Sequence, residues 1–171
     1  MLFRSPSLFA FGCGECEEGV IVCPLLDARR KQVYAGAYYD YAEIIEGAPY
    51  LLADFLDQLK ELVFAAELSD GTPLSSMPIL FVGDGAEKYR KDIEAWAEEE
   101  DLEIAIEEKY QNAGSVAEFC YDTYSEDLLL TYDKVEPEYM RIPEAERNRL
   151  AKEKGISVES ANKGFGKETS R

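Results

Sequence analysis

One acidic and two basic residues form the group in this sequence that is most suggestive of chemistry. Asp27, Arg29 and Arg30 lie in the stretch PLLDARRKQVYAGAYY, between two apolar runs. Two guanidinium groups could bind a carboxylate or a phosphate through paired hydrogen bonds, with Asp27 orienting one of them. The alternative is a solvated hairpin tip, where an Asp–Arg pair contributes little to stability. Residue chemistry alone favours the hairpin tip, because loops commonly carry charge.

A second candidate is the Gly-Asp-Gly sequence at Gly83, Asp84 and Gly85, directly after an apolar run. Glycines between a strand and a helix permit close approach of a phosphate, and a helix start offers N–H donors. Asp84 would itself repel a phosphate unless a metal ion lay between them. We favour the simpler interpretation, in which Asp84 is the N-cap residue at a tight strand-to-helix turn.

Catalytic groups are hard to assemble from the remaining residues. The sequence contains no His, which excludes Ser-His pairs, Cys-His pairs and imidazole ligands. The carboxylates at residues 98–101, and those of Glu107 and Glu108, are consecutive in the sequence. Consecutive side chains point in different directions, so they do not converge on one metal or acid–base site. Much of enzymology is thereby excluded, and from these residues we predict no catalytic residue, no metal site and no cofactor in this chain.

Four cysteines occur, at positions 13, 16, 23 and 120. Cys13 and Cys16 have the spacing of a redox or zinc pair, but no second pair completes a set of four ligands. We interpret the cysteines as structural or incidental thiols of a reduced, cytoplasmic protein. The residues before them lack the apolar core of a secretory signal, and no run approaches the roughly 20 apolar residues of a membrane span.

The charge composition limits the partners. The chain has 35 acidic and 18 basic residues and a formal net charge of −17. Binding to nucleic acid requires clustered Lys and Arg, and a field of this sign repels a polyanion. We expect no membrane binding and no direct nucleic-acid binding, so any role near RNA is indirect or confined to a small basic corner.

Hydrophobic periodicity predicts that the folded part begins with three antiparallel strands, at residues 20–28, 32–40 and 41–47. Pro24 should lie near the start of the first strand or at a bulge, because Pro cannot donate to a ladder. In the second strand, the apolar side chains from Val33 onward alternate towards one face.

Helices and strands then alternate. The predicted elements are a helix from Leu51, a central strand at 78–82, a helix at about 86–100, a strand at 102–106 and a helix that opens at Ser115. The order βββαβαβα predicts an α/β fold with a mixed sheet of about five strands. It is the order of a ribonuclease H-like domain, the unit of the actin-like ATPase superfamily, and the chain resembles a single lobe of that kind.

Three segments together resemble one family. PLLDARRKQVYAGAYY, PILFVGDGAEKY and PEYMR have the order and spacing found in the C-terminal half of TsaB, a bacterial subunit used in making threonylcarbamoyladenosine in tRNA. The resemblance covers roughly residues 18–142, and DARR…VY is its most specific part. Lys31 stands where relatives often have Gly, and it would cost about 1 kcal/mol if that position needs a positive φ.

The resemblance also implies a domain organisation. Family members of full length carry an additional N-terminal lobe with a phosphate loop, so we expect a truncated gene or a fragment. Residues 1–17 would be an irregular or helical remnant of the segment between lobes, and residues 18–142 would be the C-terminal lobe. Residues 143–171 are polar and predict a short exposed helix followed by a flexible tail.

By resemblance, the protein is a non-catalytic subunit that scaffolds TsaD, with TsaE in the wider complex. ATP or ADP and a metal ion are implied only for that partner complex. Residues 83–85 would shape a turn that faces the cleft between lobes. The residues expected to contact a partner or the other lobe are Asp27, Arg29, Arg30, Tyr34, Tyr139 and Arg141.

Two other functions stay open at this point. An actin-like ATPase or kinase remnant would bind nucleotide by itself, although the first phosphate loop is missing. A glycoprotease-like hydrolase has little support, because the sequence has neither His nor a Gly-x-Ser-x-Gly element. A lobe without its neighbour would also expose apolar surface, which a homodimer could cover.

Overall fold

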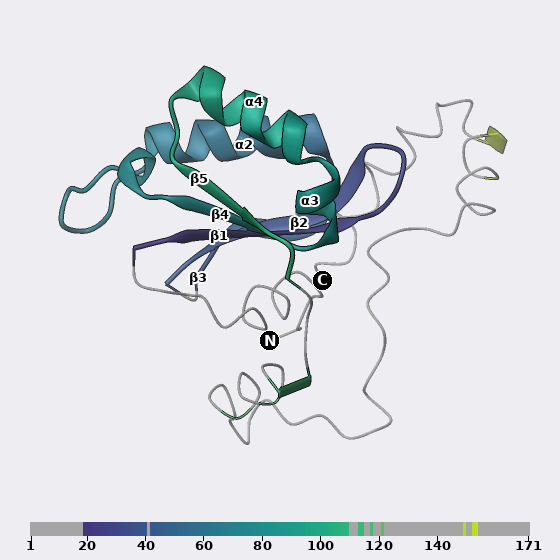
Figure 1. The fold of residues 1–171 in the computed structure, drawn as a ribbon, viewed down its shortest axis with the longest axis horizontal. Coiled ribbons are helices and arrows are strands. Elements are labelled where there is room, and N and C mark those ends of the chain that lie inside the picture. Colours follow the sequence, from purple (N-terminus) through teal and green to yellow (C-terminus); the bar gives the residue numbers. More distant parts are fainter. Residues whose placement is uncertain are drawn as a thin grey trace. The chain divides into compact units, whose positions relative to one another are not determined.

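In the computed structural model, three consecutive strands form the antiparallel half of the sheet (Figure 1). They are β1 (Ile21–Asp27), β2 (Gln32–Tyr39) and β3 (Ala42–Leu51). The three expected strands are confirmed, and β3 is longer than the predicted 41–47. Pro49 lies within this extra length, which it can do because β3 is at the edge of the sheet.

Two crossovers then add parallel strands on the other side of β1. The elements after β3 are α2 (Leu52–Ala65), η1 (Leu74–Ser76), β4 (Ile79–Val82), α3 (Asp84–Lys88), α4 (Arg90–Glu100) and β5 (Ile104–Glu107). Strand β4 is parallel to β1, and β5 is parallel to β4. The sheet order is β3-β2-β1-β4-β5. The prediction of an α/β fold with a mixed sheet of five strands is therefore confirmed.

The structure describes residues 19–40, 42–109, 113–114, 117, 121, 149 and 152–153. The chain divides into two compact units, residues 1–129 and 130–171. In the second unit Arg149, Lys152 and Glu153 are helical, and Arg149 Nε lies 3.7 Å from Glu153 Oε1. The sequence predictions for the segment 1–17, the cap at Ser115 and the tail beyond residue 153 fall outside the described residues.

The main core lies between the sheet and the helices α2 and α4, which run side by side over one face (Figure 1). Alternation along the strands places Ile21, Leu25 and Phe81 in this core, and all three are fully buried. The edge of the Trp96 ring meets Phe81 at a centroid distance of 6.2 Å and an interplanar angle of 90°. The opposite face buries a smaller cluster around Val22, Tyr38, Leu80 and Val82. The sheet therefore carries apolar side chains on both faces.

Two predicted details are wrong. Pro24 is the fourth of seven residues in β1, and the β1–β2 register passes from Val22–Tyr38 to Leu25–Ala35 without a paired residue at Pro24. The missing N–H thus falls in a gap in the β1–β2 ladder, whereas on its other side Pro24 pairs with Val82 of β4. This gap makes the central position tolerable.

The second wrong detail is the single helix at 86–100. It is two helices, α3 and α4, that meet at Tyr89, whose φ of −104° and ψ of 18° are not helical. This break turns the buried Tyr89 side chain towards the end of β1, where its hydroxyl finds an acceptor. Among the described residues, no helix is both long and apolar enough to cross a membrane.

Candidate functional site: the DARR corner and the GDG turn

The tip of the β1–β2 hairpin has an unusual backbone. Arg29, Arg30 and Lys31 all have left-handed conformations, with φ values of 64°, 54° and 60°. The left-handed conformation costs about 1–2 kcal/mol for each residue that is not glycine. Ala28 N donates to Gln32 O at 2.9 Å, and Gln32 N donates to Arg29 O at 3.0 Å, so the ladder closes directly below the tip. The positive φ considered for Lys31 is confirmed. Arg29, Arg30 and Lys31 are all exposed, so the tip carries three cations at one corner.

Asp27 holds this corner to the rest of the domain. Its carboxylate accepts hydrogen bonds from Arg29 N at 3.0 Å, Lys88 Nζ at 2.7 Å and Tyr89 Oη at 3.2 Å. Partial burial raises the pKa of Asp27, but the hydrogen bonds from Lys88, Arg29 N and Tyr89 outweigh burial, so the net pKa is lowered. The same contact raises the pKa of Lys88. The cation that pairs with Asp27 therefore comes from α3.

The Gly-Asp-Gly sequence forms the turn from β4 into α3. Gly83 is the N-cap residue and has a φ of 109°, which favours glycine, while Asp84 is the first residue of the helix. The expectation that Asp84 would be the N-cap is wrong. Its Oδ1 instead accepts a hydrogen bond from Asp27 N at 3.1 Å.

The second glycine of the turn, Gly85, is needed for close packing. A Cβ atom at this position would lie 2.9 Å from Leu25 O, which is closer than real Cβ contacts. The glycine therefore lets α3 approach the backbone of β1. This close approach is to a strand, so the turn has a structural use that requires no phosphate.

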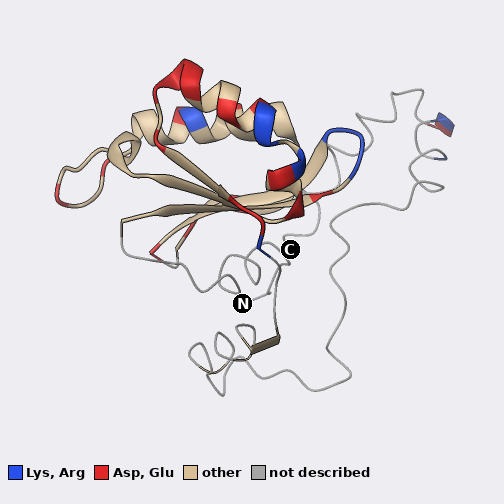
Figure 2. Cartoon of the chain, viewed as in Figure 1, with Lys and Arg blue, Asp and Glu red and all other residues tan. Residues whose placement is uncertain are grey.

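These contacts join two of the family-like segments. We call Asp27, Asp84, Lys88 and Tyr89 the Asp27 clasp. Asp27 belongs to DARR, whereas the other three belong to GDGAEKY, and the bonded residues are 57 to 62 positions apart in the sequence. Figure 2 shows the basic hairpin tip close to the charged residues of α3. The clasp fixes the position of a basic corner on a strongly acidic chain.

The other predicted site residues do not join the clasp. Tyr34 is half-buried on β2 and pairs with Leu26 of β1 and Pro49 of β3. Tyr139 and Arg141 lie outside the described residues, as do Cys13 and Cys16.

Cys23 is a free cysteine that lies buried in β1. Burial raises the pKa of the Cys23 thiol, which stays protonated and is a poor nucleophile. Within the described ranges, no group of three or more His, Cys, Asp or Glu residues gathers to bind a metal ion.

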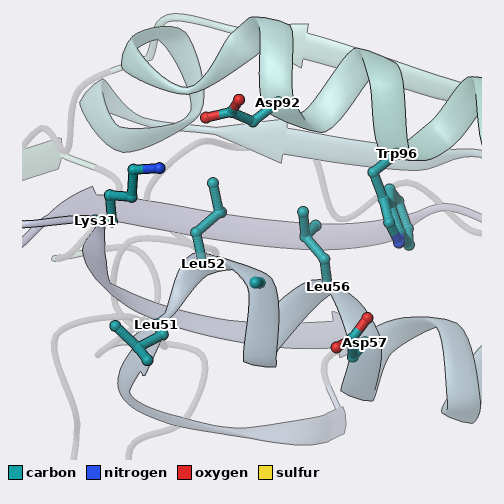
Figure 3. Close-up of a pocket in the computed structure, with 8 residues that line it drawn as sticks. Lys31, Leu51, Leu52, Leu56, Asp57, Asp92 and Trp96 are labelled. Atoms are coloured by element: carbon teal, nitrogen blue, oxygen red, sulfur yellow. The ribbon is translucent and has the colours of Figure 1, made fainter. Parts of the chain in front are cut away.

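Sequence reasoning missed a pocket between α2 and α4 (Figure 3). Its volume is about 450 Å³. Leu51, Leu52, Ala53, Leu56 and Trp96 supply apolar walls, and Lys31, Asp57 and Asp92 supply charge. From the sequence, these apolar residues indicate only the core-facing sides of two helices. The feature that could have indicated a pocket was the single Trp on a helix rich in carboxylates.

The comparisons with known proteins add no relative. No protein-family model matches the chain, and no curated protein matches it. The relation to TsaB is therefore a proposal that depends on the three segments and on how the described ones meet.

Proposed function

We propose that the chain is a TsaB-like, non-catalytic subunit that supports threonylcarbamoyladenosine synthesis on tRNA in the cytoplasm. In this proposal the described sheet belongs to a ribonuclease H-like lobe. The chain scaffolds TsaD, with TsaE in the wider complex, and any ATP, ADP or metal ion is bound by that complex. The chain itself neither catalyses a reaction nor binds the tRNA directly.

The observation that carries the proposal is the Asp27 clasp. DARR and GDGAEKY resemble the family independently, and Asp27 bonds directly to Asp84, Lys88 and Tyr89. The resemblance thus concerns residues that form one physical unit. The sheet order, with three antiparallel strands followed by two parallel ones, supports the ribonuclease H-like lobe.

The proposal assigns a use to the exposed corner. The clasp is occupied by internal hydrogen bonds, so Asp27 positions the corner, at which Arg29 and Arg30 are exposed. Tyr34, Tyr139 and Arg141 are the further proposed contacts with a partner or another lobe. On a chain with a net charge of −17, a fixed basic corner gives an acidic partner surface a defined point of attachment.

The test measures binding of purified chain to its cognate TsaD by isothermal titration calorimetry. Arg29→Glu should weaken binding several-fold, because it places a carboxylate against an acidic surface. Lys91→Glu is the matched control, since Lys91 is also exposed but lies on α4. Absence of binding by the unmodified chain would refute the scaffold role, and equal weakening by both variants would refute the role of the corner.

The nucleotide-binding alternative has less support. Gly85 is used against Leu25 O, and Asp84 Oδ1 accepts from the backbone of β1. A nucleotide-binding remnant would instead require these groups at a phosphate. The hydrolase alternative gains no observation in its favour.

A further inference from the structure

The α2–α4 pocket combines an apolar floor with charged ends. Leu52 and Leu56 are buried beneath it, and Leu51 at its border is 40% exposed. In Figure 3 the Trp96 ring extends from α4 towards α2, which carries both leucines. A cavity of about 450 Å³ has room for one large side chain and part of a peptide backbone.

Trp96 lines the pocket with its ring and not with its N–H group. Its Nε1 is buried and donates to no acceptor among the described residues. Buried N–H groups in folded proteins are nearly always hydrogen-bonded, since an unpaired donor is costly. Because Nε1 is closed to solvent, an occupant of the pocket meets the Trp96 ring, on which an apolar or a cationic side chain can pack.

The surrounding charge selects the sign of the occupant. Helices α2 and α4 together carry eight carboxylates and three cations. Lys31 and Asp92 face each other across one end of the pocket, while Asp57 stands at the other end, below Trp96 (Figure 3). The Lys31 end is balanced and the Asp57 end is negative. A cationic group is therefore favoured at the Asp57 end, and an anionic occupant is disfavoured.

We propose that the α2–α4 pocket binds a short extended segment of a partner protein, in which a large apolar residue is followed two positions later by Lys or Arg. The apolar side chain lies on Leu52 and Leu56 and against the Trp96 ring, and the basic side chain pairs with Asp57. This proposal does not depend on TsaD or on the family, because it uses only the pocket and its charges.

Trp96 makes the proposal directly testable, because it is the only tryptophan of the chain. The probe is a capped heptapeptide, Gly-Ser-Phe-Gly-Lys-Ser-Gly, titrated into the full chain to millimolar concentrations while indole emission is recorded. We expect a saturable change in emission. A peptide with Glu in place of Lys should bind about tenfold more weakly, and one with Ser in place of Phe should not bind.

Two charge reversals on α2 complete the test. Asp57→Lys should reverse the preference, so that the Glu peptide binds better than the Lys peptide. Glu61→Lys makes the same change one turn away, on an exposed residue outside the pocket, and should keep the original order. Circular dichroism checks that both variants fold. Asp57→Asn replaces Asp57→Lys if the latter does not fold, and it should abolish the preference for the Lys peptide.

Three results would overturn the proposal. The first is no saturable change with the Phe-Lys peptide, and the second is equal binding of the Lys and Glu peptides to unmodified protein. The third is a change in Trp96 emission with protein concentration alone, which would assign the pocket to a second copy of the chain.

Discussion

Replacing Asp27 by Ala should destabilise the first unit by about 2–3 kcal/mol. The change removes the acceptor of the Tyr89 hydroxyl, which belongs to a side chain only 8% exposed, and an unpaired group there costs about 1–2 kcal/mol. It also removes the acceptor of Arg29 N, which costs roughly another 1 kcal/mol in a turn that already has three left-handed residues. The exposed Lys88 ammonium returns to water, so its loss matters least.

The assay is urea unfolding followed through Trp96 emission. Asp27→Asn keeps an acceptor oxygen for Arg29 N and Tyr89 while removing the charge, so it should cost about 1 kcal/mol or less. Asp70→Ala is the matched control, because Asp70 also accepts a hydrogen bond from a backbone N–H two residues on, and that bond stays within its own loop. If Asp27→Ala changes the midpoint no more than Asp70→Ala does, the clasp does not stabilise the fold.

Three further predictions concern the same corner. Gly85→Ala should destabilise by about 1–3 kcal/mol, because its Cβ would meet Leu25 O, whereas Gly71→Ala has open space and should suffer only from its positive φ; urea midpoints of the two variants decide. Lys31→Gly should raise stability by about 0.5–1 kcal/mol by relieving a left-handed residue, and a lowered midpoint would contradict the strain. The net pKa of Asp27 is lowered, so its stabilisation is present above the unfolded pKa of about 3.9 and is lost as pH falls through the folded value; acid titrations should show a weaker pH dependence in Asp27→Asn, and an unchanged dependence would refute this.

The fold was largely predictable because its signals are local and periodic. Val33, Ala35 and Ala37 alternate towards the core as expected, and all three are buried. The helix α2 was visible from the repeat of Leu52, Phe55 and later residues.

The errors involve contacts between distant segments. The helix break at Tyr89 and the N-cap at Gly83 both depend on the end of β1, where Asp27 supplies an acceptor and a donor. Local propensity favoured Asp84 as the N-cap residue. Nothing nearby in the sequence shows that its carboxylate instead accepts a hydrogen bond from the backbone of β1.

The candidate site was only half visible for a similar reason. Charge and turn residues marked Asp27 and Arg29, but the pairing of Asp27 with Lys88 joins positions 61 apart. The α2–α4 pocket required knowledge that Lys31, Leu56 and Trp96 come together from three elements. A sequence pattern shows that Trp96 is apolar and cannot show that its N–H lacks an acceptor.

The proposed role as a TsaB-like scaffold requires that the chain bind TsaD. The most direct measurement is size-exclusion chromatography with light scattering on the purified chain, alone and mixed with cognate TsaD. We expect a co-eluting complex whose mass is the sum of the partners in a defined ratio. A folded chain that elutes unchanged beside TsaD would contradict it.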